Sequence, residues 1–123
     1  MRNPILIVDD SLTTRMLEQS ILESAGFTVE VAASAEEALE RIGHTRYSLL
    51  LVDVEMPGMD GFGLITHIRA DPRVCEVPCI LVTSCDSDEY KRRGELAGAN
   101  AYIVKGLFDQ VAFLQKIAEL TAR

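Results

Sequence analysis

The feature that most constrains the fold is a repeated alternation between short apolar runs and longer helical stretches. Residues 5–8, 49–52 and 79–82 are continuous apolar runs, too short for helices and typical of strands buried on both faces. Residues 27–31 alternate between apolar and polar side chains, which favours a strand at a sheet edge. Residues 101–104 are a fifth predicted strand. Because a helical pattern follows each strand, the sequence predicts five βα units in a row.

The first predicted helix extends from about residue 11 to residue 25. Its apolar residues Leu17, Ile21 and Ala25 recur every four positions and indicate the side that packs inward. Gly26 follows, and a glycine at this position commonly ends a helix.

The later helices have similar signals. Ser34 and Glu37 have the spacing of a capping box at the start of the second helix, which Gly43 closes. The helix predicted over residues 87–97 is polar and marginal. The others are predicted over residues 62–70 and from about residue 109, the last with Leu114, Ile117, Ala118 and Thr121 on one side.

Five consecutive βα units imply an α/β fold, a parallel sheet with helices on both faces. A five-stranded open sheet of this kind commonly has the strand order 2-1-3-4-5, the flavodoxin-like (βα)5 arrangement. Ligands then bind beyond the carboxyl ends of the strands, between the first and the third. A length of 123 residues fits one domain, and we expect residues 1–123 to form it.

The charge of the chain excludes several classes of partner. Lys plus Arg is 12 and Asp plus Glu is 19, so the formal net charge is −7, which disfavours direct binding to nucleic acid or to an anionic membrane. The one basic run, residues 91–93, is expected to be a solvated helix face. No apolar run is long enough to cross a bilayer, and three cysteines without zinc-ligand spacing are expected to be reduced thiols. We therefore expect a cytoplasmic protein.

Polar residues directly follow four of the five predicted strands. The carboxyl ends of parallel strands meet at one edge of the sheet, so these side chains are expected to share one crevice. A single aspartate after a strand is usually a turn former or a helix cap, but the coincidence over four strands points to a site. Its members are Asp9, Asp10, Asp53, Thr83 and Lys105, with Ser84 as an alternative to Thr83.

Three neighbouring carboxylates repel one another, so the cluster predicts a bound cation. Hard oxygen ligands suit Mg²⁺, which is commonly held by one or two carboxylates together with phosphate oxygens. Lys105 adds a positive charge, and the hydroxyl of Thr83 can donate to a phosphoryl oxygen. Asp53 lies at the predicted switch point of the sheet, which makes it the candidate nucleophile for an aspartyl phosphate.

In their order and spacing, these motifs resemble the response-regulator receiver domains of two-component signalling over essentially the whole chain. The resemblance implies a phosphorylation-dependent switch and not an enzyme that turns over other substrates. In such a switch, Asp53 accepts a phosphoryl group from the phosphohistidine of a histidine kinase. The motifs are Ile7-Val8-Asp9-Asp10, Val52-Asp53, Met56-Pro57-Gly58-Met59-Asp60-Gly61, Thr83, Tyr102 and Lys105.

The resemblance also implies a metal site. Asp9 and Asp10 organise Mg²⁺, with Asp10 and Asp53 as direct ligands. The main-chain carbonyl of Glu55 completes the protein ligands, and Lys105 pairs with the phosphoryl group.

A conformational switch is implied in the same way. Thr83 moves toward the phosphoryl group and Tyr102 swings inward behind it, unless Tyr102 is only an aromatic side chain packed at the strand end. This changes the face formed by the last two βα units, where a downstream protein target binds. Glu55 and Cys85 either tune the access of hydrolytic water or are ordinary solvated loop residues.

Gly106 departs from the family pattern, which most often has proline after the lysine. Glycine accepts almost any backbone angle, so we expect a trans peptide bond between Lys105 and Gly106 and a looser loop. Residues 105–110 and 11–15 resemble the variant found in receiver modules fused to chemotaxis-type hybrid histidine kinases. The kinase is accordingly expected either as a separate protein or in the same polypeptide.

Two other functions stay open at this point. A binding module with this fold that has lost phosphorylation would not need the acceptor site, yet all of its candidate residues are present. A Mg²⁺-dependent phosphatase with an aspartyl intermediate would need a dedicated general acid and a substrate lid. The short predicted connections contain no such insertion.

Overall fold

A five-stranded parallel sheet forms the centre of the computed structural model, which describes residues 3–106 and 109–122. The strand order is β2-β1-β3-β4-β5, which confirms the predicted topology and places the second strand at an edge. The strands are β1 (Ile5–Val8), β2 (Val29–Ala32), β3 (Leu49–Asp53), β4 (Cys79–Thr83) and β5 (Ala101–Val104).

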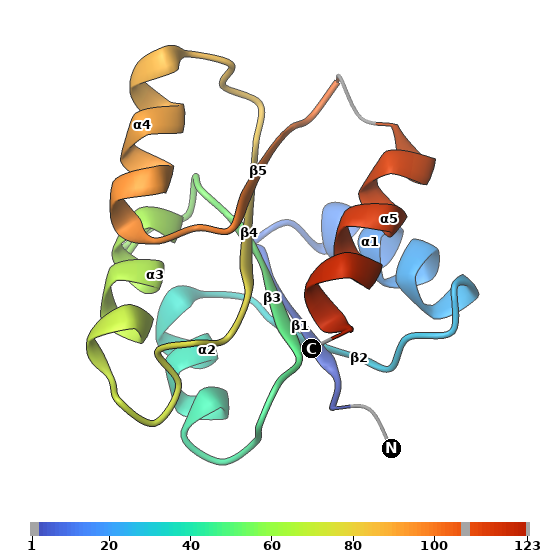
Figure 1. Ribbon diagram of the computed structural model, residues 1–123, viewed down its shortest axis with the longest axis horizontal. Coiled ribbons are helices and arrows are strands. Elements are labelled where there is room, and N and C mark those ends of the chain that lie inside the picture. The colour runs from blue at the N-terminus through green and yellow to red at the C-terminus, as the bar shows by residue number, and fades with distance from the viewer. Residues whose placement is uncertain (1–2, 107–108, 123) are drawn as a thin grey trace.

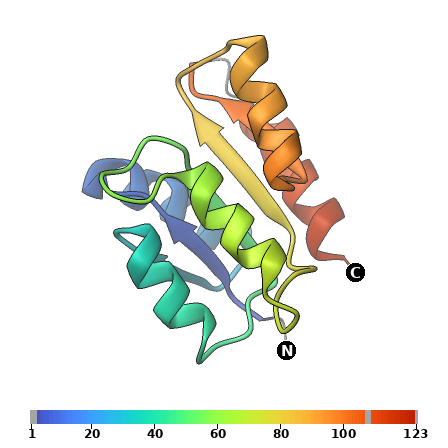
Figure 2. The same cartoon turned by 90° about the vertical axis from the view of Figure 1, so that its left-hand side faces the viewer.

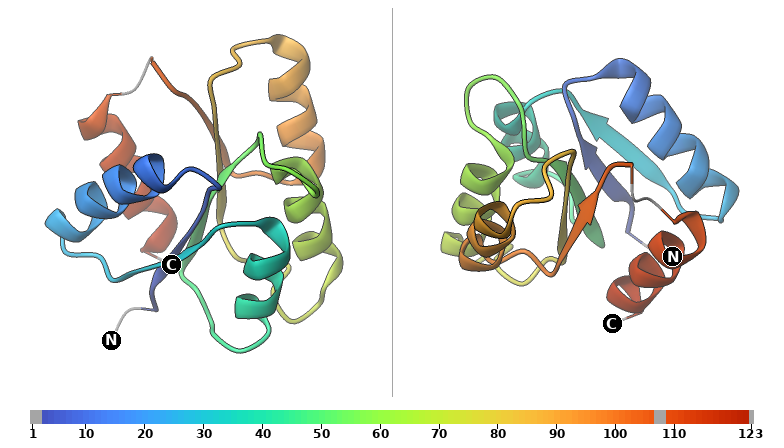
Figure 3. Two further views of the ribbon diagram at one scale, coloured as in Figure 1. Left: turned by 180° about the vertical axis from the view of Figure 1, so that it is seen from behind. Right: turned by 90° about the horizontal axis from the view of Figure 1, so that it is seen from above.

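Helices cover both faces of the sheet (Figure 1 and Figure 2). On one face lie α1 (Leu12–Ser24) and α5 (Gln110–Thr121), and on the other lie α2 (Ala35–Ile42), α3 (Gly61–Ala70) and α4 (Asp88–Ala97) (Figure 3). None of the described helices is long and apolar enough to span a membrane.

Each helix follows a residue whose side-chain oxygen accepts a hydrogen bond from an N–H of the first turn. These residues are Ser11, Ser34, Asp60, Ser87 and Asp109.

The inner strands are apolar up to the polar residues Asp53 and Thr83 that end β3 and β4, because helices pack on both of their faces. In β3, Leu50 and Val52 belong to the core on the side of α2 and α3. The alternate residues Leu49 and Leu51 belong to the core on the side of α1 and α5. All four are at most 1% exposed. The edge strand β2 is only partly buried and begins at Val29, two residues later than predicted.

The inward side of α1 differs from the prediction. Leu17 is 61% exposed and Ala25 is exposed, whereas Glu18 and Leu22 are buried. The buried row therefore lies one position along the chain from the predicted one, and Ile21 is only partly buried. The first half of α1 adjoins the polar ends of the strands, where an ionisable side chain, Glu18, is enclosed rather than an apolar one.

The inward side of α5 differs less. Its buried residues are Phe113, Ile117 and Leu120. Ile117 was predicted on this side, but Ala118 is exposed. Spacings of three and of four residues both continue one side of a helix, so the apolar pattern alone left the choice between neighbouring rows open.

Gly61 brings the start of α3 against the end of β3. Its N–H donates a hydrogen bond of 3.0 Å to the carbonyl oxygen of Val54. A Cβ added to Gly61 would lie 2.5 Å from the carbonyl oxygen of Asp53, a distance that real Cβ atoms do not reach. Glycine therefore permits the close packing of α3 beside the residue with which β3 ends.

Replacing Gly61 by alanine is expected to lower the free energy of unfolding by about 1–3 kcal/mol, because the methyl group must push α3 away from β3. Gly63→Ala is the matched control on the same helix, since its added Cβ first meets the flexible side chain of Met59, at 3.0 Å. Urea unfolding measures both variants. Equal free energies of unfolding for the two would contradict the close-approach interpretation.

Candidate functional site

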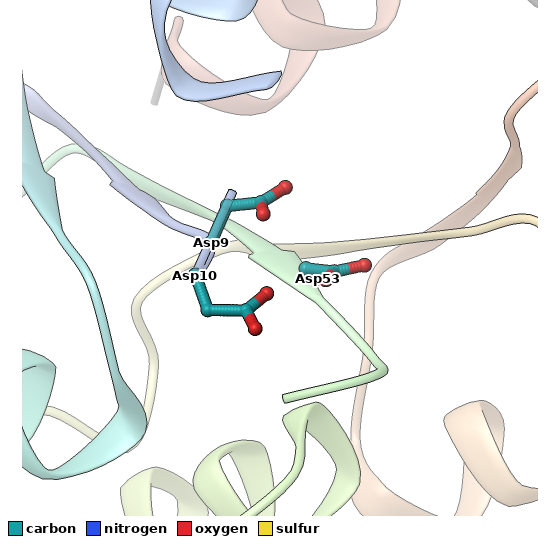
Figure 4. Close-up of side chains that lie close together, drawn as sticks. All are labelled: Asp9, Asp10 and Asp53. Atoms are coloured by element: carbon teal, nitrogen blue, oxygen red, sulfur yellow. The ribbon is translucent and has the colours of Figure 1, made fainter. Parts of the chain in front are cut away.

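Three carboxylates converge at the carboxyl ends of β1 and β3. Asp9 and Asp10 follow β1 directly, and Asp53 is the last residue of β3. Because β1 and β3 are hydrogen-bonded neighbours, their ends present these side chains to one another (Figure 4). Each side chain offers an oxygen within 4.8 Å of the others. Asp9 and Asp53 are buried and Asp10 is exposed, so the acidic cluster is present with Asp10 on its solvent side.

Lys105 brings a positive charge to this cluster from the end of β5. Its Nζ lies 3.4 Å from Oδ1 of Asp53 and 3.9 Å from Oδ2 of Asp9. Burial acts to lower the pKa of Lys105, but the carboxylates of Asp53 and Asp9 outweigh burial and raise it. One ammonium thus interacts with two carboxylates.

Asp9 is held in a fixed orientation by its neighbours. Its Oδ1 accepts a hydrogen bond of 2.8 Å from the N–H of Ser11, and the guanidinium of Arg15 donates one of 2.8 Å to its main-chain carbonyl. Its Oδ2 is buried and accepts no hydrogen bond from any described residue. A buried carboxylate oxygen without a donor favours a cation as its partner.

Burial and mutual repulsion both disfavour the charged forms of these acids. Burial raises the pKa of Asp53 to about 6, and the charge of Asp9 adds to the shift while Lys105 opposes it. Burial likewise raises the pKa of Asp9. A divalent cation would relieve this repulsion. Three converging carboxylates are hard oxygen ligands of the kind that Mg²⁺ selects, so the residues fit that metal.

A further buried acid, Glu18, interacts electrostatically with this cluster and was not identified from the sequence. It lies on the inward side of α1 and is 9% exposed. Burial raises its pKa to about 8, and the charges of Asp9 and Asp53 add to the shift while Lys105 opposes it. The signal that could have found it is its position four residues before Leu22, within one helical row.

A chain of hydrogen bonds extends from the site to β5. The hydroxyl of Thr83, the last residue of β4, donates to the carboxylate of Glu55. The same hydroxyl oxygen accepts from the N–H of Cys85 at 3.1 Å. The hydroxyl of Tyr102 in turn donates to the carbonyl of Cys85 at 2.8 Å. Thr83 is fully buried and Ser84 is exposed, which favours Thr83 as the inward hydroxyl.

The loop after Lys105 has an unusual backbone. Gly106 has a φ of +92°, an angle that proline cannot adopt. No cis peptide bond occurs among the described residues, which confirms the predicted trans bond between Lys105 and Gly106. Leu107 and Phe108, part of the segment that resembles the hybrid-kinase variant, lie outside the described residues.

Comparison with known proteins identifies the family. The model of the response regulator receiver domain matches residues 5–118. The chain belongs to this family. This receiver domain is therefore a CheY-like module of two-component signalling.

Some relatives of this receiver domain are much longer proteins, and others have about its own length. It is 41% identical over 117 residues to the gliding motility regulatory protein of Myxococcus xanthus, spanning 95% of this chain and 15% of that protein. It is 34% identical over 120 residues to the chemotaxis protein CheY of Pseudomonas aeruginosa, spanning 97% of this chain and 96% of that protein. The structure of the signal receiver domain of a signal transduction histidine kinase from Syntrophus aciditrophicus is similar with a TM-score of 0.90 and 31% identity, covering 98% of this chain and 90% of that one.

The raised pKa of Glu18 predicts a pH dependence of stability. The folded state binds the Glu18 proton more tightly than the unfolded chain does. The stabilisation that this tighter binding gives the folded state is fully present below about pH 4.5 and is lost as the pH rises toward about 8. Glu18→Gln cannot ionise. Its free energy of unfolding, relative to wild type, is expected to rise across that interval by roughly 2–5 kcal/mol.

Urea unfolding of metal-free protein between about pH 4.5 and about pH 8 measures this difference. Glu23→Gln is the control, because Glu23 is exposed on the same helix. A difference between wild type and Glu18→Gln that stays constant over this pH range would contradict the prediction.

Proposed function

We propose that this receiver domain is a phosphorylation-dependent switch in which Asp53 accepts a phosphoryl group from the phosphohistidine of a histidine kinase. The observation that carries the proposal is the position of Asp53, at the end of β3 beside two further carboxylates and 3.4 Å from the ammonium of Lys105. Receiver domains are signalling switches and not ordinary enzymes. The chemistry proposed for this one is limited to its own phosphorylation and dephosphorylation.

In the transfer, a carboxylate oxygen of Asp53 attacks phosphorus in line with the phosphorus–nitrogen bond of the phosphohistidine. The new phosphorus–oxygen bond forms as the phosphorus–nitrogen bond breaks, and the electron pair of the broken bond returns to the imidazole ring. The ammonium of Lys105 offsets the charge on the phosphoryl oxygens. A pKa of about 6 leaves most of Asp53 ionised at neutral pH, as a nucleophile requires.

Mg²⁺, when bound, neutralises charge on the phosphoryl oxygens and among the carboxylates. Its proposed ligands are Asp10, Asp53 and the main-chain carbonyl of Glu55. Asp9 organises the site, and its buried Oδ2, which accepts no hydrogen bond from a described residue, supports this role.

Phosphorylation changes which acceptors compete for the hydroxyl of Thr83. Before transfer this hydroxyl donates to Glu55, and a phosphoryl group on Asp53 adds charged oxygens as alternatives. Movement of Thr83 disturbs the hydrogen bond that its hydroxyl oxygen accepts from the N–H of Cys85. Because the carbonyl of Cys85 accepts a hydrogen bond from the hydroxyl of Tyr102, the change reaches β5. Glu55 and Cys85 are also the residues proposed to tune access of the hydrolytic water.

The element proposed to respond is α4. Gly94 is its one buried residue, and Leu96 is 81% exposed. A Cβ added at Gly94 would lie 3.3 Å from the ring of Tyr102, so the ring packs directly against the helix. A helix with so few buried contacts moves at low energetic cost. The face formed by β4, α4, β5 and α5 is the proposed binding surface for a downstream protein.

The proposed phosphoryl donor is a histidine kinase, either a separate protein or part of the same polypeptide. The second arrangement is supported by the similar receiver domain of a histidine kinase. The Myxococcus relative, of which this chain spans 15%, shows that a similar domain can be part of a much longer protein. The net charge of −7 disfavours nucleic acid and anionic membranes as partners, and a cytoplasmic location is proposed.

Asp53→Asn is expected to abolish Mg²⁺-dependent labelling by acetyl phosphate, because an amide replaces the nucleophilic carboxylate without changing its shape. Intact-mass spectrometry measures the result, and the wild type should gain one phosphoryl group. Asp86→Asn serves as the control, since Asp86 is an exposed residue that pairs with Lys91. Labelling of Asp53→Asn at the wild-type level would refute the assignment.

Asp10→Ala is expected to weaken Mg²⁺ binding by at least about tenfold, the loss that is typical even for outer partners of a metal. The metal-free variant should also be more stable than wild type, because one of three crowded like charges is gone. Thermal unfolding across a Mg²⁺ titration measures both effects. An unchanged Mg²⁺ dependence would exclude Asp10 as a ligand.

A further inference from the structure

We propose that Arg69 anchors the C-terminal end of α4, so that α4 rotates about this end when phosphorylation displaces its N-terminal end. The rotation rests on the proposed function of Asp53, because phosphorylation supplies the displacement. The anchor does not, because its hydrogen bonds belong to the unphosphorylated structure.

Arg69 lies in the last turn of α3 and binds three other segments of the chain. Its Nη1 donates hydrogen bonds to the carbonyls of Cys75, at 3.0 Å, and Val77, at 2.6 Å, in the loop before β4. Its Nε donates to the carbonyl of Gly98 at 3.0 Å, and its Nη2 donates to Oδ1 of Asn100 at 2.9 Å. Gly98 follows α4 directly and Asn100 precedes β5. One planar guanidinium therefore joins the ends of α3 and α4 to the starts of β4 and β5.

The packing around Gly98 leaves this end of α4 little room to move. Gly98 ends the helix with a φ of +103°, and a Cβ added there would lie 2.8 Å from Cγ of Arg69. Asn100 is fixed in turn to Cys79, the first residue of the buried strand β4. Oδ1 of Asn100 accepts from the N–H of Cys79, and the N–H of Asn100 donates to the carbonyl of Cys79, both at 2.8 Å.

The N-terminal end of α4 is connected instead to the phosphorylation site. Ser87 precedes the helix, is exposed, and accepts a hydrogen bond of 3.1 Å from the N–H of Tyr90. The same Ser87 oxygen accepts from the thiol of Cys85 at 3.4 Å. Because the N–H of Cys85 donates to the hydroxyl of Thr83, a displacement of Thr83 reaches α4 at this end.

The contacts of this half of α4 with α3 tolerate small shifts. The rings of Tyr90 and Phe62 meet edge to face with centroids 5.3 Å apart, and the guanidinium of Arg93 lies 4.3 Å from the centroid of Phe62. Ring contacts of this kind persist over a range of distances and angles. A shift at Gly98 would instead break a charge-assisted hydrogen bond from Arg69. The displacement is therefore expected to be largest near Ser87 and smallest at Gly98.

Amide hydrogen exchange in the unphosphorylated protein tests the anchor. Arg69→Met retains most of the length of the side chain and removes every donor. The amides of Gly98 and Ala99 should then exchange at least about tenfold faster, relative to the amide of Lys91 near the start of α4, than they do in wild type. An unchanged ratio would overturn the anchor.

Arg73→Met is the matched control, because Arg73 is an exposed arginine that pairs with Asp71 alone among the described residues. It should leave the exchange ratio unchanged. If Arg69→Met does not fold, Arg69→Lys replaces it, since an ammonium lacks the planar fork and cannot reproduce all four hydrogen bonds.

NMR of wild type, before and after labelling by acetyl phosphate with Mg²⁺, tests the rotation. The nuclear Overhauser effect (NOE) between the Arg69 CγH2 group and the Gly98 Hα atoms should persist, and the one between the rings of Tyr90 and Phe62 should change. Loss of the first NOE, or no change in the second, would overturn the rotation. Absence of labelling would refute the proposed function and the rotation with it, whereas hydrogen exchange would still decide the anchor.

Discussion

The rest of the structure depends on the repulsion among acids enclosed at the ends of β1 and β3. Burial removes the water that would screen these charges, so the pKa values of Asp9, Asp53 and Glu18 all rise. What keeps the acids together is the packing of the strands beneath them, because every residue of β1 and β3 is buried. The stability of the apolar core therefore opposes the repulsion between the acids at its edge. The site consequently favours whatever supplies positive charge.

A phosphoryl group on Asp53 would increase the repulsion within this cluster. It adds negative charge to a cluster in which Lys105 is the nearest cation to Asp53 among the described residues. Phosphorylation without a divalent cation would intensify the repulsion. With a divalent cation bound, the phosphoryl oxygens would serve as ligands of the metal, and the metal would offset their negative charge. Metal and phosphoryl group are thus expected to stabilise one another. This mutual dependence follows from charge alone and needs no change in the fold.

The strands and their carboxyl-end residues could be predicted because their signals are local. Each inner strand is a continuous apolar run, and the rule for parallel sheets brings Asp9, Asp53 and Lys105 together without knowledge of any side-chain contact. The inward side of α1 could not be predicted in this way. The row through Leu17 is more apolar at its start than the row through Glu18, yet the second is buried, with Leu22 in the apolar core and Glu18 near the charged site. Apolar periodicity describes packing against a core and fails where a helix packs against polar strand ends. The hydrogen bond from Thr83 to Glu55 could not be predicted from the sequence, because it depends on a loop conformation.

The helices on the two sides of the site differ in how firmly they are held. On the α1 side, Leu22 is fully buried, and Arg15 binds the carbonyl of Asp9, so the helix is anchored at two points. On the other side, α4 buries only Gly94. If Thr83 changes its acceptor as proposed, we expect the resulting displacement to be absorbed by the element with the fewest buried contacts. On this proposal, the distribution of buried contacts favours a response in α4 over one in α1.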